Sequence, residues 1–213
     1  MKLNKFGKVL ILAPHTDDGE LGLGGSINHL IEKGNDIYCH AFSNASKSLP
    51  KNLPKNILEV EFNNAMKILG VPKENLTIHP YELRTFTYHR QEILDRLIKI
   101  RDEIKPDLIF LPSSTDFHQD HQVIAQEGLR AFKKSCILGY ELPWNNITFP
   151  THCFIVLKEK HIEKKIEALS CYNTQKYRTY LNPEFIRSLA ITRGTQIQVN
   201  FAEAFEMSRW VWD

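Results

Sequence analysis

The sequence has little of what would place it outside the ordinary globular proteins. It contains 4 cysteines in 213 residues, none in a Cys-x-x-Cys pair, which excludes the disulfide framework typical of small secreted domains. No window comes near the ~20 apolar residues that a membrane-spanning helix needs. The apolar run Val9–Ala13 is too short for the core of a signal peptide. We therefore expect a cytoplasmic protein with reduced thiols and no integral membrane segment.

An excess of charge of one sign is also missing. Lys and Arg total 27 against 25 for Asp and Glu, which gives a formal charge of +2, and no basic run concentrates it. A nucleic-acid-binding surface needs clustered positive charge, so we expect no nucleic-acid partner. No repeat, Gly/Ser linker or charge block marks a domain boundary, and we predict that residues 1–213 form a single domain. A chain of this length can form a full core without disulfides.

Short apolar runs alternate with longer stretches of helical periodicity over most of the chain. The predicted strands are Lys8–Ala13, Asp36–Phe42, Leu76–His79, Asp107–Pro112, Ile137–Glu141 and Cys153–Leu157. The predicted helices are Gly25–Lys33, Lys55–Leu69, Arg90–Ile104, Asp120–Lys133, Glu159–Cys171 and Pro183–Ala190. Repeated strand–helix–strand units predict an α/β protein with an open, mostly parallel sheet and helices on both faces.

Two clusters of histidine and aspartate follow the two most apolar predicted strands. The first reads His-Thr-Asp-Asp at 15–18, and the second reads His-Gln-Asp-His at 118–121. Ligands of open parallel sheets bind outside the carboxyl ends of the strands, where the strand order reverses. We therefore expect both clusters to face one crevice, although they lie far apart in the sequence. Either cluster alone could be a turn or a helix cap, and it is their joint occurrence that favours a site.

The side chains in these clusters are those of a catalytic metal site. The imidazoles of His15 and His121 and the carboxylate of Asp18 would supply three ligands, and an open fourth position is the arrangement of catalytic zinc. Such an ion lowers the pKa of a bound water from 15.7 to about 7. Zinc suits these ligands, although Fe, Co or Mn would accept them as well. We therefore predict Zn²⁺ as the cofactor, with other divalent metals as alternatives.

The other polar residues of the clusters suggest further roles. Asp17 cannot easily bind the same ion as its neighbour Asp18, so we predict that it is the general base. His118 would stabilise the oxyanion or protonate a leaving amine. Asp120 would accept the N–H of an imidazole and so orient the ring.

The glycines that follow the first cluster allow a second interpretation. Gly22-x-Gly24-Gly25 resembles part of a dinucleotide-binding fingerprint. Two carboxylates precede these glycines, however, where the fingerprint needs bare amide groups to hold a pyrophosphate. We instead expect the glycines to let the start of the following helix approach the sheet closely.

With these motifs the sequence resembles the LmbE-like, or PIG-L, N-acetylglucosamine deacetylases. The segment Ala13–Gly25 is similar to the family's Pro/Ala-His-x-Asp-Asp and Leu-Gly-x-Gly-Gly pattern, and residues 118–121 are similar to its His-x-Asp-His motif. Phe201–Glu206 resembles the family's C-terminal Tyr/Phe-Ala-Glu-Ala-Phe segment. Two departures, Thr16 for the usual proline and Gly19-Glu20 for the usual acidic residue, concern the loop shape and the substrate more than the metal.

The resemblance implies a Rossmann-like three-layer fold and a zinc-dependent hydrolase that removes the N-acetyl group from an N-acetylglucosamine-type sugar. By position it places the zinc ligands on His15, Asp18 and His121, the general base on Asp17 and a second catalytic histidine on His118. The assignments agree with those made from the chemistry of the side chains.

Substrate contacts are expected from three further residues. Arg84 and Arg90 lie between the third predicted strand and the next helix, and an arginine there could bind a phosphate or sugar hydroxyls. Trp144 could stack on a sugar ring. The alternatives are a solvated helix start for the arginines and simple packing for the tryptophan. Trp210–Trp212 is expected to form an edge strand or a subunit contact, and the sequence is compatible with a homo-oligomer.

The sequence leaves the substrate open. The partner that we expect is a small N-acetylated sugar, which could be free, nucleotide-linked, lipid-linked or part of a glycoconjugate. One alternative keeps the metal and acts as an amidase of a thiol-sugar conjugate. Another is a non-catalytic metal-binding protein of the same fold, but such a protein would need neither Asp17 nor His118.

Overall fold

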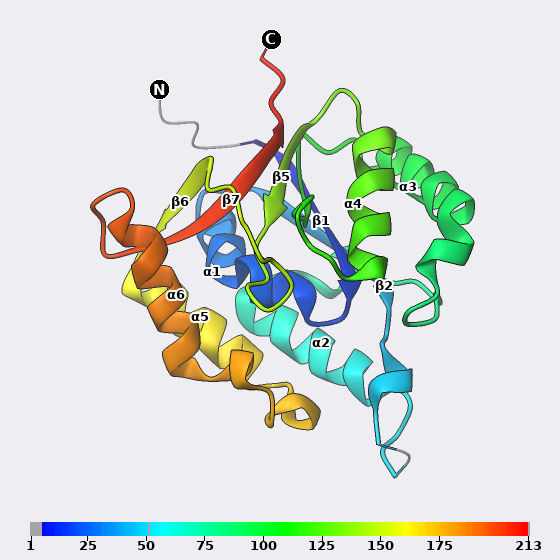
Figure 1. Ribbon diagram of the computed structural model, residues 1–213, viewed down its shortest axis with the longest axis horizontal. Helices are drawn as coiled ribbons and strands as arrows, with labels where there is room; N and C mark the ends of the chain where they lie inside the picture. The colour runs from blue at the N-terminus through cyan, green and yellow to red at the C-terminus, as the bar shows by residue number, and fades with distance from the viewer. Residues whose placement is uncertain (1–5, 51, 213) are drawn as a thin grey trace.

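The computed structural model describes residues 6–50 and 52–212, and a seven-stranded sheet forms its centre (Figure 1). The strands are β1 (Lys8–His15), β2 (Asp36–Ser43), β3 (Leu76–Ile78), β4 (Leu108–Pro112), β5 (Cys136–Tyr140), β6 (Cys153–Leu157) and β7 (Phe201–Arg209). Their order in the sheet is β3-β2-β1-β4-β5-β7-β6. Strands β1 to β5 are parallel, whereas β7 runs antiparallel to both of its neighbours. The sheet is thus mostly parallel, as predicted.

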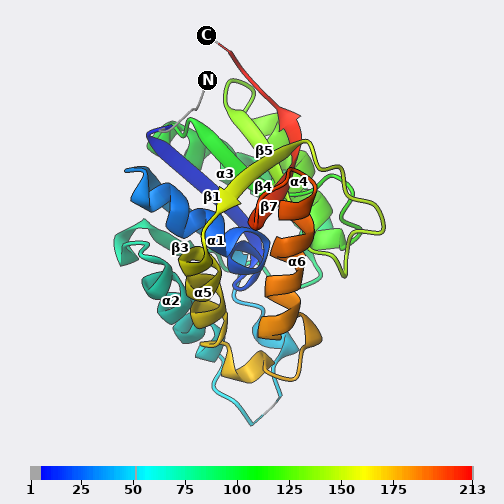
Figure 2. The same cartoon turned by 90° about the vertical axis from the view of Figure 1, so that its left-hand side faces the viewer.

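Helices cover both faces of this sheet. They are α1 (Asp18–Glu32), α2 (Ile57–Leu69), α3 (Arg90–Ile104), α4 (Gln119–Ala131), α5 (Glu159–Leu169) and α6 (Pro183–Thr195). Helices α3 and α4 pack together on one face, and α1, α2 and α5 pack together on the other (Figures 1 and 2). Helix α6 packs on β7 and α5. The arrangement confirms the predicted three-layer α/β fold.

Strand β1 runs through the middle of the sheet and is apolar on both faces. Leu10 and Leu12 pack into the core below α3 and α4, whereas Val9, Ile11 and Ala13 pack into the core below α1 and α2. All five side chains are fully buried. A strand that is covered on both faces must be apolar at successive positions, which is why this run was recognisable in the sequence.

The strand order reverses between β1 and β4. From β1 the chain proceeds outward through β2 to β3, and it then returns to β4 and β5 on the other side of β1. The helices that follow these two strands, α1 and α4, lie on opposite faces of the sheet. The loops after β1 and β4 therefore border one crevice. These loops carry the two His/Asp clusters.

Helix α1 begins at Asp18, so the predicted start at Gly25 is wrong by seven residues. A kink at Leu23 (φ −148°, ψ 27°) divides the helix. The carboxylate of Glu203 on β7 accepts the backbone N–H groups of Gly25 and Ser26, at 3.2 and 2.7 Å, and so caps the second segment. The sequence pattern revealed only this second segment, because the first turn is rich in charged residues and glycine.

The glycines of α1 let the helix lie close to the sheet, as expected. A Cβ atom on Gly22 would lie 2.4 Å from Cδ2 of Tyr140 on β5, and one on Gly25 would lie 2.6 Å from Cδ1 of Leu157 on β6. At Gly22 the tyrosine ring leaves room only for glycine, and at Gly25 a larger residue would have to displace the Leu157 methyl group.

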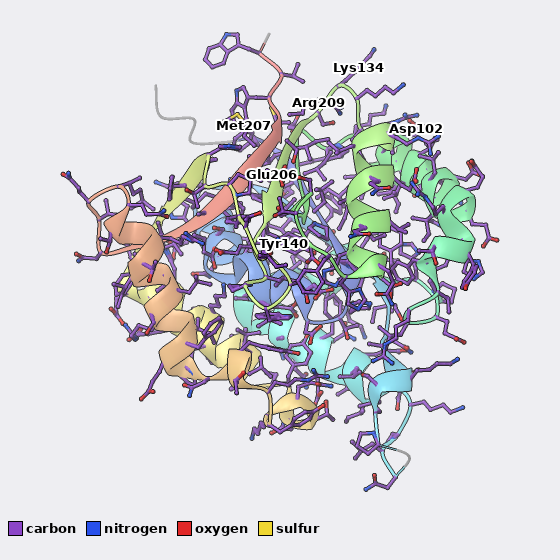
Figure 3. All side chains as sticks on the ribbon, in the orientation of Figure 1. Asp102, Lys134, Tyr140, Glu206, Met207 and Arg209 are labelled. Carbon is purple, nitrogen blue, oxygen red and sulfur yellow. The ribbon has the colours of Figure 1, made fainter. Side chains whose placement is uncertain are left out.

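Strand β7 lies inside the sheet, between β5 and β6. The expected edge strand at Trp210–Trp212 is therefore wrong, since the strand ends at Arg209. Buried acidic residues interrupt the apolar pattern of β7, so the strand is not recognisable in the sequence. In the fold these acids have hydrogen-bond partners. Glu206 accepts hydrogen bonds from the hydroxyls of Ser113 and Ser114, at 2.7 and 2.6 Å. Figure 3 shows Glu206 in the interior, with Asp102 and Lys134 at the periphery.

The other elements agree with their predicted bounds to within two residues, except that α6 continues to Thr195, beyond Ala190. All four cysteines are free thiols. Over residues 6–50 and 52–212, no helix combines the length and the apolar character needed to cross a membrane.

Candidate active site

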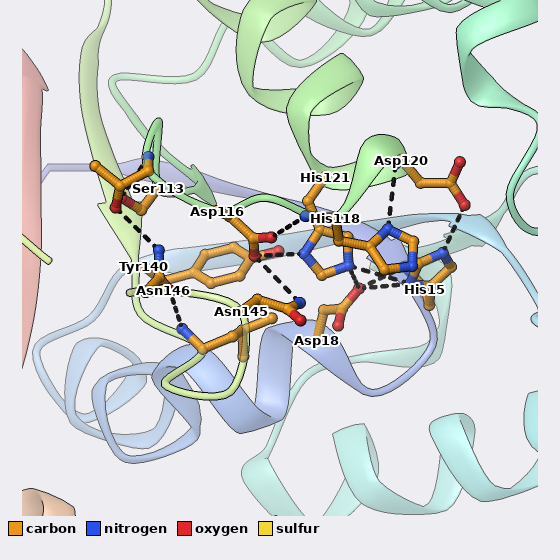
Figure 4. Close-up of polar contacts among 12 residues, drawn as sticks. His15, Asp18, Ser113, Asp116, His118, Asp120, His121, Tyr140, Asn145 and Asn146 are labelled. Carbon is orange, nitrogen blue, oxygen red and sulfur yellow. Dashed lines mark hydrogen bonds and ion pairs between the residues drawn. The ribbon is translucent and has the colours of Figure 1, made fainter. Parts of the chain in front are cut away.

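Three polar atoms meet where the two loops border the crevice. His15 ends β1, Asp18 begins α1, and His121 lies in the first turn of α4. Asp18 Oδ2 lies 3.1 Å from His15 Nδ1 and 3.3 Å from His121 Nε2, and these two nitrogens are 3.3 Å apart (Figure 4). Ligand atoms about 2.0–2.1 Å from a tetrahedral zinc ion are about 3.3 Å from one another. The three atoms therefore have the spacing of one face of a tetrahedral metal site.

A carboxylate lies behind each of the two imidazoles. His15 Nε2 is 3.1 Å from Asp120 Oδ2, and His121 Nδ1 is 2.7 Å from Asp116 Oδ2. Such carboxylates accept the second ring N–H, fix the tautomer and leave the other nitrogen free to bind a metal. Asp120 is thus placed where the sequence predicted an orienting carboxylate. Asp116 was not predicted, although its position five residues before His121 was a usable signal.

The charges around these groups favour a cation. Burial by itself would lower the pKa of His121, but the carboxylates of Asp18 and Asp116 raise it to about 10. Burial likewise opposes the charge of His15, whose pKa is nevertheless raised by Asp18 and Asp120. Burial would raise the pKa of Asp18, but the two imidazoles hold it well below its usual range. The negative potential that holds protons here would equally attract a divalent ion.

His118 forms the N-cap of α4. Its Nδ1 accepts the backbone N–H of Asp120 at 3.2 Å, and its own backbone N–H donates to Asp116 Oδ1 at 2.8 Å. With Nδ1 engaged, the ring presents Nε2, and a nitrogen of His118 lies within 4.8 Å of those of His15 and His121. Burial and the positive charges of those two residues lower the pKa of His118 to about 4. The ring is therefore neutral at pH 7.

Asp17 occupies the N-cap position of α1 without capping it. Within the described part of the chain, its carboxylate makes no hydrogen bond to another residue. Burial and the adjacent Asp18 carboxylate raise the pKa of Asp17 to about 6. A carboxylate with a pKa near neutrality suits a proton acceptor.

A cavity of about 240 Å³ opens over these groups. Its lining includes His15, Asp17, Asp18, His118 and His121. Its further polar and aromatic lining comes from Thr16, Ser48, Arg84, Trp144, Asn145, Gln175, Arg178 and Tyr180. Two of the three residues that the sequence suggested for substrate binding, Arg84 and Trp144, therefore border the cavity.

Arg90, the third of these residues, lies elsewhere. Its Nε donates to Glu127 Oε1 at 2.9 Å, and its Nη2 donates to Gln126 Oε1 at 2.9 Å, so it ties α3 to α4. Glu127 is fully buried and needs a positive partner. Arg90 thus serves this packing, and the prediction of a substrate contact finds no support in the structure.

The connection between α5 and α6 contributes lining residues that the sequence did not reveal. Arg178 Nε donates to Gln175 Oε1 at 3.1 Å, and its guanidinium carbon lies 5.7 Å from the ring centroid of Tyr180. Tyr180 stacks on Trp144, with ring centroids 3.9 Å apart. No motif distinguishes this connection, because its place at the cavity depends on how α5 and α6 pack.

The fold and the site define an α/β protein with a cluster of histidine and aspartate side chains that have the spacing of metal ligands. The cluster lies where the strand order of the sheet reverses, between β1 and β4. Residues 10–132 match the family model described as "PIG-L: GlcNAc-PI de-N-acetylase", and the chain belongs to this family. The resemblance noted in the sequence is thereby confirmed.

Individual relatives agree with the family. The chain is 29% identical over 175 residues to "Uncharacterized deacetylase YaiS" of Escherichia coli, which covers 78% of this chain and 90% of the relative. The structure of N,N'-diacetylchitobiose deacetylase from Pyrococcus horikoshii superposes with a TM-score of 0.78 at 21% identity, over 96% of this chain and 85% of the other. GalB, a 4-carboxy-2-hydroxymuconate hydratase from Pseudomonas putida, superposes with a TM-score of 0.77 at 16% identity, over 97% and 98% of the two chains.

The fold alone therefore does not determine the reaction, since a hydratase shares it. Family membership and the deacetylase relatives class the protein as an N-deacetylase, a hydrolase of an amide bond. Deacetylases of the PIG-L family are metal-dependent, and the donor atoms of the crevice fit a metal ion.

Proposed function

We propose that the protein removes the N-acetyl group from an N-acetylglucosamine-type sugar, with Zn²⁺ held by His15, Asp18 and His121. The observation that carries this proposal is the triangle of ligand atoms with sides of 3.1, 3.3 and 3.3 Å at the switch point of the sheet. Two imidazoles and one carboxylate are a ligand set of catalytic zinc sites, although other divalent ions accept it. When bound, the metal polarises the amide carbonyl and lowers the pKa of a water molecule towards neutrality.

Asp17 is the general base in this proposal. Its carboxylate lines the cavity next to Asp18 and has no competing hydrogen-bond partner among the described residues. It accepts a proton from the attacking water while the water oxygen bonds to the amide carbon. The raised pKa of Asp17 lets it hold this proton long enough to pass it on.

His118 acts on the amide at the other side of the proposed site. It presents Nε2 to the cavity because Nδ1 is held by the backbone of α4. Hydrogen bonding from His118 stabilises the negative charge that develops on the amide oxygen. The ring is neutral at pH 7 and keeps its proton on Nε2, so the leaving amine takes up the proton that Asp17 accepted from the water as the C–N bond breaks. The products are acetate and a free amino sugar.

The cavity lining supports a sugar as the substrate. Trp144 and Tyr180 offer aromatic rings of the kind on which sugar rings pack. Arg84 and Arg178 offer guanidinium groups for sugar hydroxyls or for an anionic substituent. These contacts are compatible with free, nucleotide-linked, lipid-linked and glycoconjugate sugars. They are also compatible with a thiol-sugar conjugate, the substrate of the alternative amidase.

The single domain, the cytoplasmic location and the homo-oligomer stay predictions.

The test combines metal analysis with acetate release. The purified protein is analysed for zinc and assayed on N-acetylglucosamine, diacetylchitobiose and UDP-N-acetylglucosamine, with and without chelator and with one equivalent of zinc restored. We expect about one zinc per chain and acetate release that the chelator abolishes and zinc restores. Chelator-insensitive acetate release would contradict the metal role. Bound zinc without acetate from any sugar would contradict the proposed substrate class and favour the thiol-sugar conjugate.

A further inference from the structure

The two neighbouring aspartates of the site are held in different ways. Asp18 Oδ2 accepts the backbone N–H of His15 at 2.8 Å and also contacts two imidazoles. Asp17, in contrast, makes no side-chain hydrogen bond to another residue in the part of the chain that the structure describes. The position of the Asp17 carboxylate therefore depends on the backbone of the turn between β1 and α1.

That turn contains a buried carbonyl group that neither element satisfies. Thr16 is 1% exposed and lies after the last residue of β1 and before α1. The first backbone hydrogen bond of the helix runs from Leu21 N–H to Asp17 O, at 3.0 Å. The carbonyl oxygen of Thr16 therefore accepts no hydrogen bond from the backbone of the helix. A buried carbonyl without a donor is costly, and a donor from elsewhere in the fold is expected.

The donor comes from the segment after α5. The hydroxyl of Tyr172 donates to the Thr16 carbonyl oxygen, and no other described residue does. The side chain of Tyr172 is fully buried. The same hydroxyl also donates to Glu20 Oε1 on α1, 2.6 Å away, so its one hydrogen is shared between the two oxygens. Tyr172 does not line the cavity, so its hydroxyl can influence the reaction only indirectly, through the turn and through Glu20 of α1.

We propose that Tyr172 is a positioning residue that fixes the Thr16–Asp17 peptide and, through it, the carboxylate of Asp17. This inference rests on the proposed function, in which Asp17 accepts the proton of the attacking water. Because a peptide group is planar, holding the Thr16 oxygen also holds the N–H and Cα of Asp17 in place. Without the hydroxyl the peptide can rotate, and Asp17 moves relative to the substrate while His15 and Asp18 keep their own contacts.

The chain offers a matched control in Tyr140. Its hydroxyl donates to the backbone carbonyl of Leu12 at 3.2 Å, and its side chain is also fully buried. Leu12 lies in the middle of β1, where pairing with His40 of β2 already holds the backbone. Tyr140→Phe thus removes the same kind of hydrogen bond from a backbone that does not depend on it.

The experiment compares wild type, Tyr172→Phe and Tyr140→Phe, each loaded with one equivalent of zinc. Each variant loses one oxygen and keeps its ring, and circular dichroism checks the fold before the kinetics are measured. We expect both variants to have a lowered Tm, and Tyr172→Phe the lower of the two, because it also leaves the buried Glu20 Oε1 without its partner. Tyr172→Phe should lower kcat on the order of 10- to 100-fold, as a small misplacement of a catalytic group does. Its KM and zinc content should stay near those of wild type, and Tyr140→Phe should retain its kcat.

Crystal structures of the three proteins provide a readout that does not depend on activity. The Thr16–Asp17 peptide and the Asp17 carboxylate should be displaced in Tyr172→Phe and unchanged in Tyr140→Phe. An unaltered kcat with Asp17 in place would overturn the inference, and so would an equal loss of kcat in both variants. If wild type itself releases no acetate from any sugar, the proposed function fails, and the crystal structures alone decide whether Tyr172 positions Asp17.

Discussion

Asp116 accepts a hydrogen bond from the imidazole of His121, with Oδ2 and Nδ1 2.7 Å apart and both side chains almost completely buried. Asn145 Nδ2 approaches the same oxygen at 3.5 Å. The carboxylate thereby directs His121 Nε2 towards Asp18 and His15. The orientation of one proposed ligand thus depends on a residue that the motifs did not include.

The first prediction concerns this carboxylate. Asp116→Ala should weaken zinc binding on the order of 10- to 100-fold, because the ring of His121 loses the group that orients it and makes it a stronger ligand. Competition with a chromophoric chelator measures the affinity. Asp102→Ala, at an exposed position far from the site, serves as the control. An unchanged zinc affinity in Asp116→Ala would show that His121 is oriented by other contacts.

The second prediction separates the base from a ligand. Asp17→Asn should keep the metal and lose activity on the order of 10²- to 10⁴-fold, because the amide cannot accept the proton. His121→Ala should lose the metal as well as the activity. Zinc analysis of both variants, alongside their rates of acetate release, tests this separation. Equal loss of zinc in both would show that Asp17 is itself a ligand.

The third prediction compares two arginines that the sequence treated alike. Arg84→Ala should raise KM several-fold with little change in kcat, because the side chain borders the cavity and contacts no reacting group. Arg90→Ala should leave KM unchanged and lower the free energy of unfolding by about 1–3 kcal/mol, because Glu127 loses one of its two arginine partners. Steady-state kinetics and urea unfolding measure the two effects. A raised KM in Arg90→Ala would restore it as a substrate contact.

The main features of the fold and much of the candidate site could be predicted, because they rest on local patterns. Strand β1 is recognisable in the sequence as an apolar run. Helix α3 is recognisable by the helical spacing of its apolar residues, and both of its ends were predicted correctly. That residues 15–18 and 118–121 meet in one crevice follows from a general rule of parallel sheets. Asp120 could be predicted to orient an imidazole because it is a carboxylate within a motif of two histidines.

The residues that could not be predicted are those placed by packing between distant segments. Tyr172 and Arg178 reach the site because the chain after α5 returns to the turn that begins α1. The cap on the second segment of α1 is supplied by Glu203, far away in the sequence. Strand β7 was missed because buried acids such as Glu206 interrupt its apolar pattern, and only the fold shows the hydroxyls that satisfy them.

The last prediction concerns stability towards acid and arises from a pair of histidines, His40 in the middle of β2 and His79 directly after β3. His40 Nδ1 and His79 Nε2 are 3.1 Å apart, and both rings are buried. Burial lowers the pKa of His40 to about 3, with further contributions from His79 and Arg96. Burial and Arg96 lower the pKa of His79 to about 4. Tyr81 also lies near Arg96 and does not titrate in the acid range.

Both histidines are therefore neutral in the folded protein at pH 5.5, whereas in the unfolded chain they bind protons below about pH 6.5. Because the unfolded state then binds more protons, this contribution to stability is present above pH 6.5 and is lost as the pH falls towards 4. Between pH 7.5 and 5.5 the pair should cost about 3 kcal/mol of the free energy of unfolding. The double variant His40→Gln/His79→Gln should lose correspondingly less on acidification, while His89→Gln, at the surface, should behave as wild type. Urea unfolding of the three proteins at both pH values measures this, and an acid loss in the double variant equal to that of wild type would assign the effect to other groups.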